Sequence, residues 1–235
     1  SYSISGELPA GLRFDALTGE ISGTPSVLSY LAAFNVTARN AIGSSHYTVY
    51  LGVVDQSPIV KYQPEKSTLI KGFAIQPLAP QSTGGAALHY SVEPVLPEGL
   101  SIDENTGTIS GTPAVVSAQM TYVIVAENSG GTNYARLTLT VNDLPPRNFS
   151  YASSSYAFVR GTAITDVVPT IAGGAIERYS VTPELPSGLS LNAMTGVISG
   201  TPAQASGGRS YTVTASNTGG TVNATFSMSV TEPPP

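Results

Sequence analysis

The sequence predicts an all-β protein built from tandem β-sandwich domains in a linear array. Its motif LPEGLSIDENTGTISGTP at 96–113 returns in near-copy at 8–25 and at 185–202, so a unit of about 88 residues is repeated. Between Gly- and Pro-rich turns, apolar and small polar residues alternate with period two, and no helical period is evident. Short, evenly spaced strands in units of this length are typical of sandwiches with about seven strands.

The composition supports this class and excludes several functions. The 235 residues include 24 Gly and 18 Pro, which favours many turns, while 41% apolar residues suffice for cores. A net charge of −5 with only ten basic residues argues against nucleic acid as a partner, because phosphate binding depends on Lys and Arg. The absence of cysteine excludes disulfides, thiolate catalysis and Cys-ligated zinc. No apolar run is long enough to insert this segment into a membrane.

The repeat predicts three domains, at residues 1–57, 58–146 and 147–235. Ser1 aligns with His89, so the first repeat is N-terminally incomplete and lacks roughly 29 residues, which in the second repeat should form two or three strands. We therefore expect exposed core and an unpaired edge in the first repeat. A simple chain boundary is favoured over strand donation by a neighbouring molecule, because the third repeat ends at Pro235 with nothing left to donate.

Each repeat is expected to contain a long antiparallel hairpin. In the second repeat, the alternating segments YVIVAEN (122–128) and ARLTLTVND (135–143) flank the Gly-rich link SGGTNY. The same pattern predicts hairpins at 34–55 in the first repeat and at 211–232 in the third.

The recurring motif is itself predicted to be a short hairpin with a structural role. Its turn formers and its inward apolar residues stay the same between copies, whereas its exposed letters vary, which is the reverse of what a binding or catalytic motif would show. The expected turn residues are Pro97, Gly99, Gly107 and Pro113, and the expected inward residues are Leu100, Ile102 and Ile109.

With LPxGLxxxxxTGxISGTP followed by an N-x-G-G turn and a Pro-rich junction, the chain resembles the He-PIG family of immunoglobulin-like repeats, allied to cadherin-like and dystroglycan-type domains. The resemblance implies tandem immunoglobulin-like sandwiches from a large exported bacterial protein, at the cell surface or secreted. In such proteins these domains act as stalks and spacers, so the implied partners are neighbouring domains of the same polypeptide. Fold analogy alone does not settle function.

The cadherin side of the resemblance implies a weak calcium site between domains. The second junction, TVNDLPP, keeps Asn142 and Asp143 of the cadherin ligand run, and Asp103 and Glu104 offer further carboxylates in the same repeat. The first junction keeps only Asp55 and its proline. The alternative is that these aspartates cap strand ends or face solvent. No other cofactor is predicted.

Catalysis finds no support in the sequence. His46 and His89 occupy non-equivalent positions of their repeats, and neither lies in a nucleophile motif, so no catalytic residue is predicted. Trp, the usual platform for sugar rings, is absent. The exposed aromatic contacts that the sequence offers to a glycan or protein are Tyr47, Tyr50, Tyr151 and Tyr156.

The leading functional prediction is a structural module that spaces another domain from a surface, with proline-stiffened junctions giving a semi-rigid rod. Two alternatives stay open: that these domains bind a cell-surface glycan or protein as an adhesin, or that they belong to a secreted polysaccharide-degrading enzyme. An apolar patch on one repeat that the other repeats lack would favour the adhesin.

Overall fold

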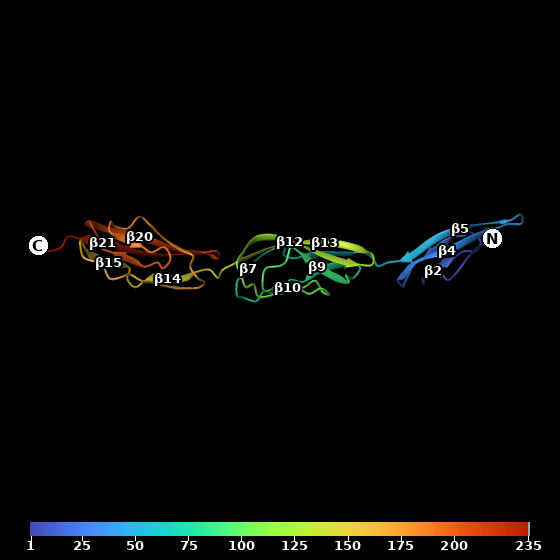
Figure 1. Ribbon diagram of the computed structural model, residues 1–235, viewed down its shortest axis with the longest axis horizontal. Coiled ribbons are helices and arrows are strands. Elements are labelled where there is room, and N and C mark those ends of the chain that lie inside the picture. The colour runs from blue at the N-terminus through green and yellow to red at the C-terminus, as the bar shows by residue number, and fades with distance from the viewer. Residues whose placement is uncertain (235) are drawn as a thin grey trace.

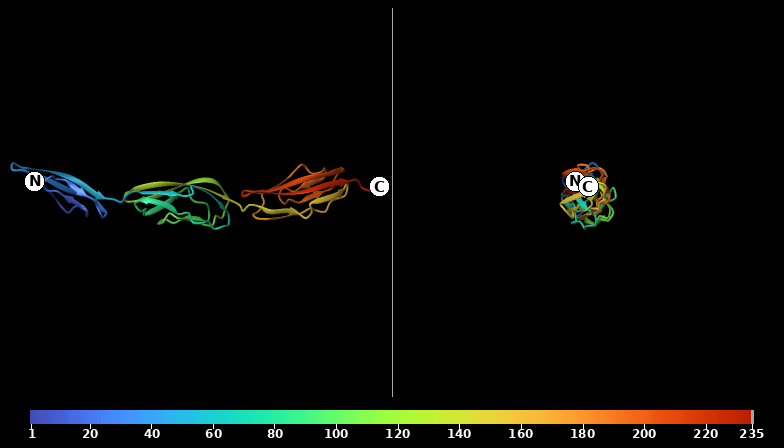
Figure 2. Two further views of the ribbon diagram at one scale, coloured as in Figure 1. Left: turned by 180° about the vertical axis from the view of Figure 1, so that it is seen from behind. Right: turned by 90° about the vertical axis from the view of Figure 1, so that its left-hand side faces the viewer.

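The computed structural model describes residues 1–234, and this part of the chain is all-β, without helices. Figure 1 shows three groups of strands following one another in line, with the N- and C-termini at opposite ends. The end-on view in Figure 2 superimposes the three groups, so the array is narrow as well as long. Tandem immunoglobulin-like sandwiches in a line are thus the observed architecture.

The second repeat is a complete sandwich of eight strands. Its main sheet has the order β7-β13-β12-β9, in which β7 and β13 run parallel and the other neighbours antiparallel. The opposing layer consists of the pairs β6-β8 and β10-β11. The strands are β6 (Pro58–Tyr62), β7 (Lys66–Ile70), β8 (Pro80–Gly84), β9 (His89–Glu93), β10 (Leu100–Ile102), β11 (Ile109–Gly111), β12 (Ser117–Asn128) and β13 (Gly131–Asn142).

The third repeat reproduces this topology. Its main sheet has the order β15-β21-β20-β17, and the pairs β14-β16 and β18-β19 face it. The strands are β14 (Arg147–Tyr151), β15 (Ser155–Val159), β16 (Pro169–Ala172), β17 (Arg178–Thr182), β18 (Leu189–Leu191), β19 (Ile198–Gly200), β20 (Ser206–Asn217) and β21 (Gly220–Thr231).

The first repeat has only the counterparts of the later strands. A three-stranded sheet of order β1-β4-β5 and the pair β2-β3 make up the unit. Its strands are β1 (Tyr2–Ile4), β2 (Leu12–Phe14), β3 (Ile21–Gly23), β4 (Ser29–Arg39) and β5 (Ser44–Val53). The segment 60–88, which has no counterpart here, contributes strands to both layers of the second repeat. In the described residues, strand β5 pairs with β4 alone and lies at the edge of its sheet.

The cores of the complete repeats lie between their two layers. Ile109, Leu137 and Leu139 have no exposed surface, and the equivalent Ile198, Phe226 and Met228 are at most 2% exposed. Alternate residues of the long strands point inward because the side-chain period of a strand is two. The predicted core positions Tyr90, Tyr122 and Tyr179 are likewise buried. Burial of this apolar surface is the main stabilising term of each sandwich.

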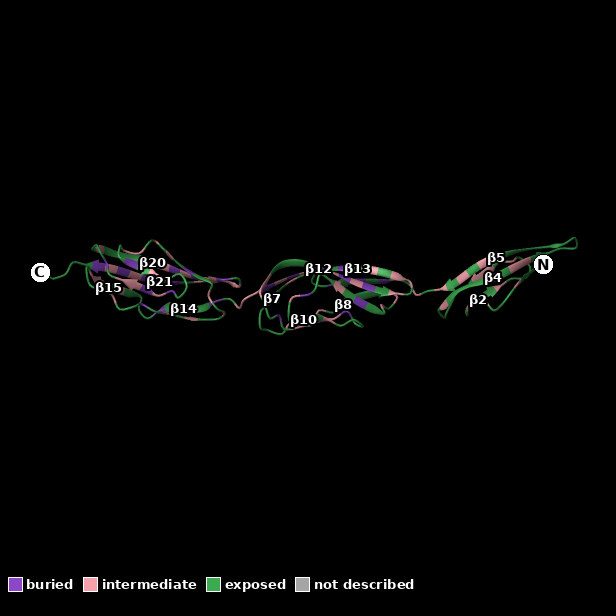
Figure 3. Ribbon diagram, in the orientation of Figure 1, coloured by how far each residue is buried: buried purple, intermediate pink, exposed green. Residues whose placement is uncertain are grey.

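The first repeat has almost no core of this kind. Phe34 is its one buried hydrophobic residue within the described chain, whereas Tyr2 is 37% exposed although its counterpart Tyr90 is 4% exposed. Figure 3 shows the contrast, with buried positions concentrated in the second and third repeats. Positions of the first repeat that correspond to core residues of the other two are therefore more exposed.

The recurring motif forms the predicted hairpin in all three repeats, as the pairs β2-β3, β10-β11 and β18-β19. Gly107 adopts φ 71°, and Asp103 Oδ1 accepts hydrogen bonds from the amides of Asn105 and Thr106, both at 2.9 Å. The second strand needs a further glycine, because a Cβ on Gly111 would lie 2.1 Å from the Gly99 carbonyl oxygen. In the complete repeats a tyrosine of the same layer also donates to this turn: the Tyr62 hydroxyl, at the end of β6, donates to the Gly107 carbonyl, and the Tyr151 hydroxyl donates to the Gly196 carbonyl.

The long hairpins are tighter than the sequence predicted. The link SGGTNY was expected to lie outside the strands, but β12 and β13 pair as far as Asn128 and Gly131, so only Ser129 and Gly130 form the turn. In β13 the alternation between more and less exposed residues already begins at Gly131, ahead of the strand that the sequence predicted from Ala135. The same two-residue turn, at Thr218 and Gly219, joins β20 and β21.

Candidate functional site: the interdomain junctions

The first junction is held by a set of polar contacts between the chain leaving the first repeat and the β12-β13 turn of the second. The Asp55 amide donates to Ser129 Oγ (2.9 Å), and the Ser129 hydroxyl donates to Asp55 Oδ2 (2.7 Å). Asn128 Nδ2 donates to the Gln56 carbonyl (2.7 Å). We call this arrangement the junction clamp: an aspartate at the end of one repeat, gripped by an Asn-Ser/Thr-Gly turn of the next.

The second junction repeats the clamp with different residues. The Asp143 amide donates to Thr218 Oγ1 (2.8 Å), and the Thr218 hydroxyl donates to Asp143 Oδ2 (2.9 Å). Asn217 Nδ2 donates to the Leu144 carbonyl (2.8 Å). Each hydroxyl thus both accepts from and donates to the same aspartate, which fixes the backbone and the side chain together.

Glycine is required in the turn because the incoming chain passes directly over it. A Cβ on Gly130 would lie 1.8 Å from the Asp55 carbonyl oxygen, and one on Gly219 would lie 2.2 Å from that of Asp143. The preceding asparagines close the turn from inside, since Asn128 Oδ1 accepts the Gly130 amide (2.9 Å) and Asn217 Oδ1 that of Gly219 (2.8 Å). The N-x-G-G signature is therefore the receiving half of the clamp.

The equivalent turn of the first repeat lacks this half. Asn40 is kept, and its Oδ1 accepts the amides of Ile42 (2.9 Å) and Gly43 (3.0 Å). Ala41 stands where Ser129 and Thr218 carry the hydroxyl, and Ile42 stands where the glycine is needed. Ile42 is 96% exposed. The turn between β4 and β5 therefore lacks the hydroxyl and the glycine that form the clamp at the two junctions.

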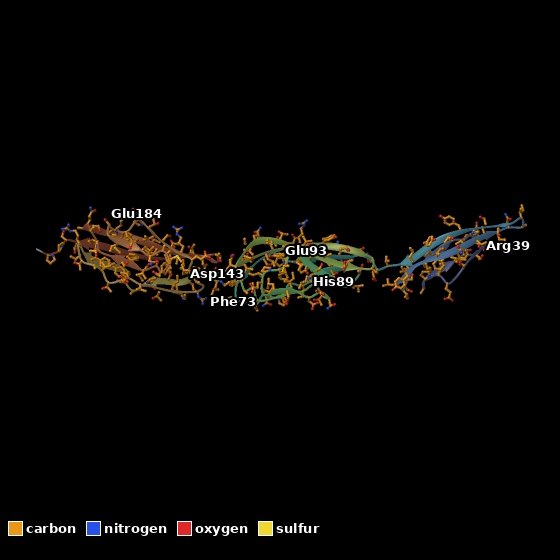
Figure 4. The ribbon with its side chains drawn as sticks, in the orientation of Figure 1. Arg39, Phe73, His89, Glu93, Asp143 and Glu184 are labelled. Carbon is orange, nitrogen blue, oxygen red and sulfur yellow. The ribbon has the colours of Figure 1, made fainter. Side chains whose placement is uncertain are left out.

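The structure does not bring the four predicted calcium ligands together. Asn142 and Asp143 lie at the second junction, and Figure 4 shows Asp143 there. The backbone carbonyl of Glu104 instead accepts the Tyr90 amide. Tyr90 on β9 lies opposite Ala126 on β12, and Ala126 lies opposite Asn133 on β13. Asn133 and Asn142 are nine residues apart on β13. At ~3.4 Å per residue, Asp103 and Glu104 therefore lie about 30 Å from Asn142 and the second junction.

Asp103 has a local role in its hairpin turn. The amide N–H groups of Thr106 and then Asn105 stabilise its charged form and lower the pKa of this carboxyl. The equivalent Asp15 has the same arrangement, and Asn192 accepts the two amides in the third repeat. A residue that alternates between Asp and Asn in one role is a turn acceptor in all three copies.

Asp143 already has a cationic neighbour. Lys71 Nζ lies 3.2 Å from Asp143 Oδ1, and the third repeat has the equivalent pair Arg160–Glu232 at 2.8 Å. Both pairs are partly exposed, so each contributes little to stability. Within residues 1–234, no three His, Asp or Glu side chains come close enough to hold a metal ion. Calcium at the second junction stays a prediction from the sequence.

The other candidate residues are dispersed. His46 and His89 are exposed on different repeats, and Figure 4 shows His89 near Glu93 on the second repeat, away from Asp143. Tyr47 and Tyr50 are 75% and 65% exposed, as an external contact requires. For Tyr151 the prediction of exposure was wrong: it is 8% exposed and packs in the aromatic core of the third repeat.

Tyr156, the other tyrosine of this segment, is only partly exposed. It is half-buried and stacks on Phe158 at a centroid distance of 5.9 Å. It also meets Phe226 edge-on at 5.6 Å. Its position on β15, which pairs with β21, makes it part of the sandwich edge.

A surface patch that the sequence did not single out lies beside the first junction. Leu28, Tyr30, Leu31 and Val54 line a hollow together with Ser129 of the second repeat. Tyr30 is 97% exposed and Leu31 72%. Their counterparts in the other repeats are smaller or polar: Ala118 and Gln119, then Gly207 and Gly208.

Fold and junctions together define a class: a tandem array of immunoglobulin-like sandwiches linked end to end by a repeated polar clamp. The family model He_PIG, "Putative Ig domain", matches residues 1–54, 57–142 and 145–231. The chain belongs to this family.

Among curated proteins the chain is similar to the serine-rich adhesin for platelets of Staphylococcus aureus. Copies from strains MRSA252 and USA300 are 29% identical over 125 residues, which is 52% of this chain. The chain spans only 9% and 6% of the length of these relatives.

Solved structures give matches at lower identity. The I-band fragment I67-I69 from titin is 14% identical, with a TM-score of 0.41 over 99% of this chain and 88% of that one. The mouse clustered PcdhgC3 EC1-3 structure is 15% identical, with a TM-score of 0.31 over 99% of this chain and 89% of that one. Residues 1–234 contain no helix of the length and apolarity needed to cross a bilayer.

Proposed function

We propose that this chain is a spacer segment of a large exported bacterial protein, which holds other domains at a defined distance from the cell surface and has no catalytic chemistry of its own. The observation that carries the proposal is the junction clamp, which occurs twice with equivalent contacts at Asp55 and Asp143. A linker that is hydrogen-bonded to the following domain cannot behave as a free tether. Its partners in this role are the neighbouring domains of the same polypeptide.

Several features support a mechanical role. The junctions are short, and the second contains Pro145 and Pro146, whose fixed φ restricts the backbone. Each sandwich touches only its neighbours, so length grows with repeat number while each unit folds around its own core. Similarity to an adhesin of Staphylococcus aureus supports the placement outside the cell.

The test is small-angle X-ray scattering of residues 1–235 in millimolar calcium and in chelator. We expect an elongated particle of the same maximum dimension in both solutions, because protein groups make the clamp contacts and Lys71 pairs with Asp143. Elongation only in calcium would instead assign the stiffness to a metal at Asn142 and Asp143. A compact particle in both solutions would contradict the spacer.

A second candidate is ligand binding by the first repeat, and the patch of Leu28, Tyr30, Leu31 and Val54 favours it. Exposed apolar clusters that sister repeats lack commonly mark interaction sites. We expect the variant Tyr30→Ala with Leu31→Gln, which copies the second repeat at these positions, to abolish any binding of the chain to host or neighbouring-cell surfaces. The control is the exposed Met194→Ala on the third repeat. Equal binding by the two variants would rule the patch out.

A further inference from the structure

The two junction clamps connect the last strand of one repeat to the last strand of the next. Asp55 follows the end of β5 and is held by Ser129, which lies two residues before β13. Asp143 follows the end of β13 and is held by Thr218, two residues before β21. Figure 1 shows the three repeats in line, so β5, β13 and β21 are joined end to end along the array by side-chain hydrogen bonds.

The covalent route between the same points is much longer. From Asp55 to Ser129 the chain runs through 74 residues and the strands β6 to β12, and 75 residues separate Asp143 from Thr218. At the first junction one more hydrogen bond acts beside the clamp, from the Ser57 hydroxyl to the Gly130 carbonyl (2.7 Å). A clamp that holds is therefore a short connection in parallel with nearly the whole of each complete repeat.

Tension that does not pass through a clamp has to pass through the parallel strand pair beside the last strand. Strand β7 pairs in parallel with residues 138–142 at the end of β13, and β15 pairs with the end of β21 in the same way. The chain reaches β7 from the first junction, whereas β13 leads to the second junction. Pulling on both junctions would thus slide β7 along β13, but a closed clamp pulls β13 from its own start and relieves this pair.

The exit of the second repeat is fixed on both sides of its junction. The Lys71 amide, just after β7, donates to the Asn142 carbonyl at the end of β13 (2.8 Å). The Asp143 carboxylate then serves both repeats, because its Oδ1 lies 3.2 Å from Lys71 Nζ and its Oδ2 accepts the Thr218 hydroxyl at 2.9 Å. One side chain therefore ties the end of the second repeat to the start of β21.

We propose that the clamps bear mechanical load. Tension along the array passes from the end of one last strand through the Ser129 or Thr218 hydroxyl into the start of the next last strand, and the strands β6 to β12 and β14 to β20 are largely spared. The inference rests on the proposed spacer, since tension acts on a segment that holds other domains away from a surface. It adds resistance to pulling to the keeping of a distance.

The test is to pull the full chain by its two ends at constant force and to measure the unfolding rate of the complete repeats. The variant Ser129→Ala with Thr218→Val removes both clamp hydroxyls and keeps the glycines of the turns. We expect it to unfold about tenfold faster or more at the same force, because each hydroxyl makes two of the clamp hydrogen bonds.

The matched control is Thr121→Val with Thr212→Val. It also removes two hydroxyls, which pair across neighbouring strands with Thr138 (2.9 Å) and Thr225 (3.3 Å) and lie off the path through the clamps. This variant should unfold at the rate of the wild type.

A second attachment separates load from general stability. The chain has no cysteine, so Arg147→Cys provides a single handle site at the exposed start of β14, beyond the second clamp. Pulling between residue 147 and the C-terminal end loads the third repeat without loading its clamp. Thr218→Val should then leave the unfolding rate unchanged.

Two outcomes would overturn the proposal. Equal rates for the clamp and control variants, pulled by the chain ends, would show that tension passes through β7 and β15 instead. Equal acceleration by Thr218→Val in both attachments would show that its hydroxyl stabilises the third repeat without bearing load. Neither outcome contradicts the spacer, which depends on the elongated shape of the wild type in solution scattering.

Discussion

Replacing Gly130 and Gly219 with alanine is expected to release both interdomain junctions. The new Cβ atoms would lie 1.8 Å and 2.2 Å from the carbonyl oxygens of Asp55 and Asp143, far inside contact distance, so the clamps must open. Each clamp loses about three hydrogen bonds worth roughly 1 kcal/mol each, which removes most of the preference for one interdomain angle. In solution scattering we expect a broader range of interdomain distances and a shorter mean length, with each sandwich still folded.

The matched control for this prediction is the pair Gly207→Ala and Gly208→Ala in the third repeat, where an added Cβ meets nothing within 4 Å. This variant should scatter like the wild type. If the clamp variant also scatters like the wild type, then the clamps do not determine the interdomain geometry, and the spacer proposal loses the observation that carries it.

Truncation of Ile109 to alanine should destabilise the second repeat by about 3 kcal/mol, because a fully buried isoleucine leaves a cavity between the sandwich layers. The same change at the equivalent Ile198 should cost the third repeat a similar amount. At Ile21, which is only half-buried in the open first repeat, the expected cost is below about 1 kcal/mol.

These costs should be measured per repeat, since three linked domains do not unfold in one two-state step. Hydrogen exchange of the slowest amides in β4, β12 and β20 reports each repeat separately. Equal costs at Ile21 and Ile109 would show that the first repeat buries its hairpin in solution as deeply as the others do.

Much of the fold was predictable because it depends on local pattern. Alternation predicted the long strands, and the recurring motif predicted a hairpin whose glycine at 107 takes a positive φ. The burial of Tyr90, Tyr122 and Tyr179 followed from their repeated positions.

The candidate site was only half predictable. The sequence marked Asp55 and Asp143 as junction residues and interpreted N-x-G-G as a turn, but it did not connect the two. The reason is distance along the chain: Asp55 and Ser129 are separated by 74 residues, and Asp143 and Thr218 by 75. A spacing of that kind carries no signal of contact until the strands between them are placed.

The sequence by itself determined the all-β class, the number of repeats, the hairpin turns and the repeated core tyrosines, because these depend on strand period, on repetition and on the backbone freedom of Gly and Pro. Only the tertiary structure decided that the aspartates grip a turn of the following domain, that Asp103 serves its own hairpin and that Tyr151 is buried while Tyr30 is exposed. Those outcomes depend on which strands become neighbours, and pairing between distant segments is fixed by packing of the whole sandwich rather than by any local pattern.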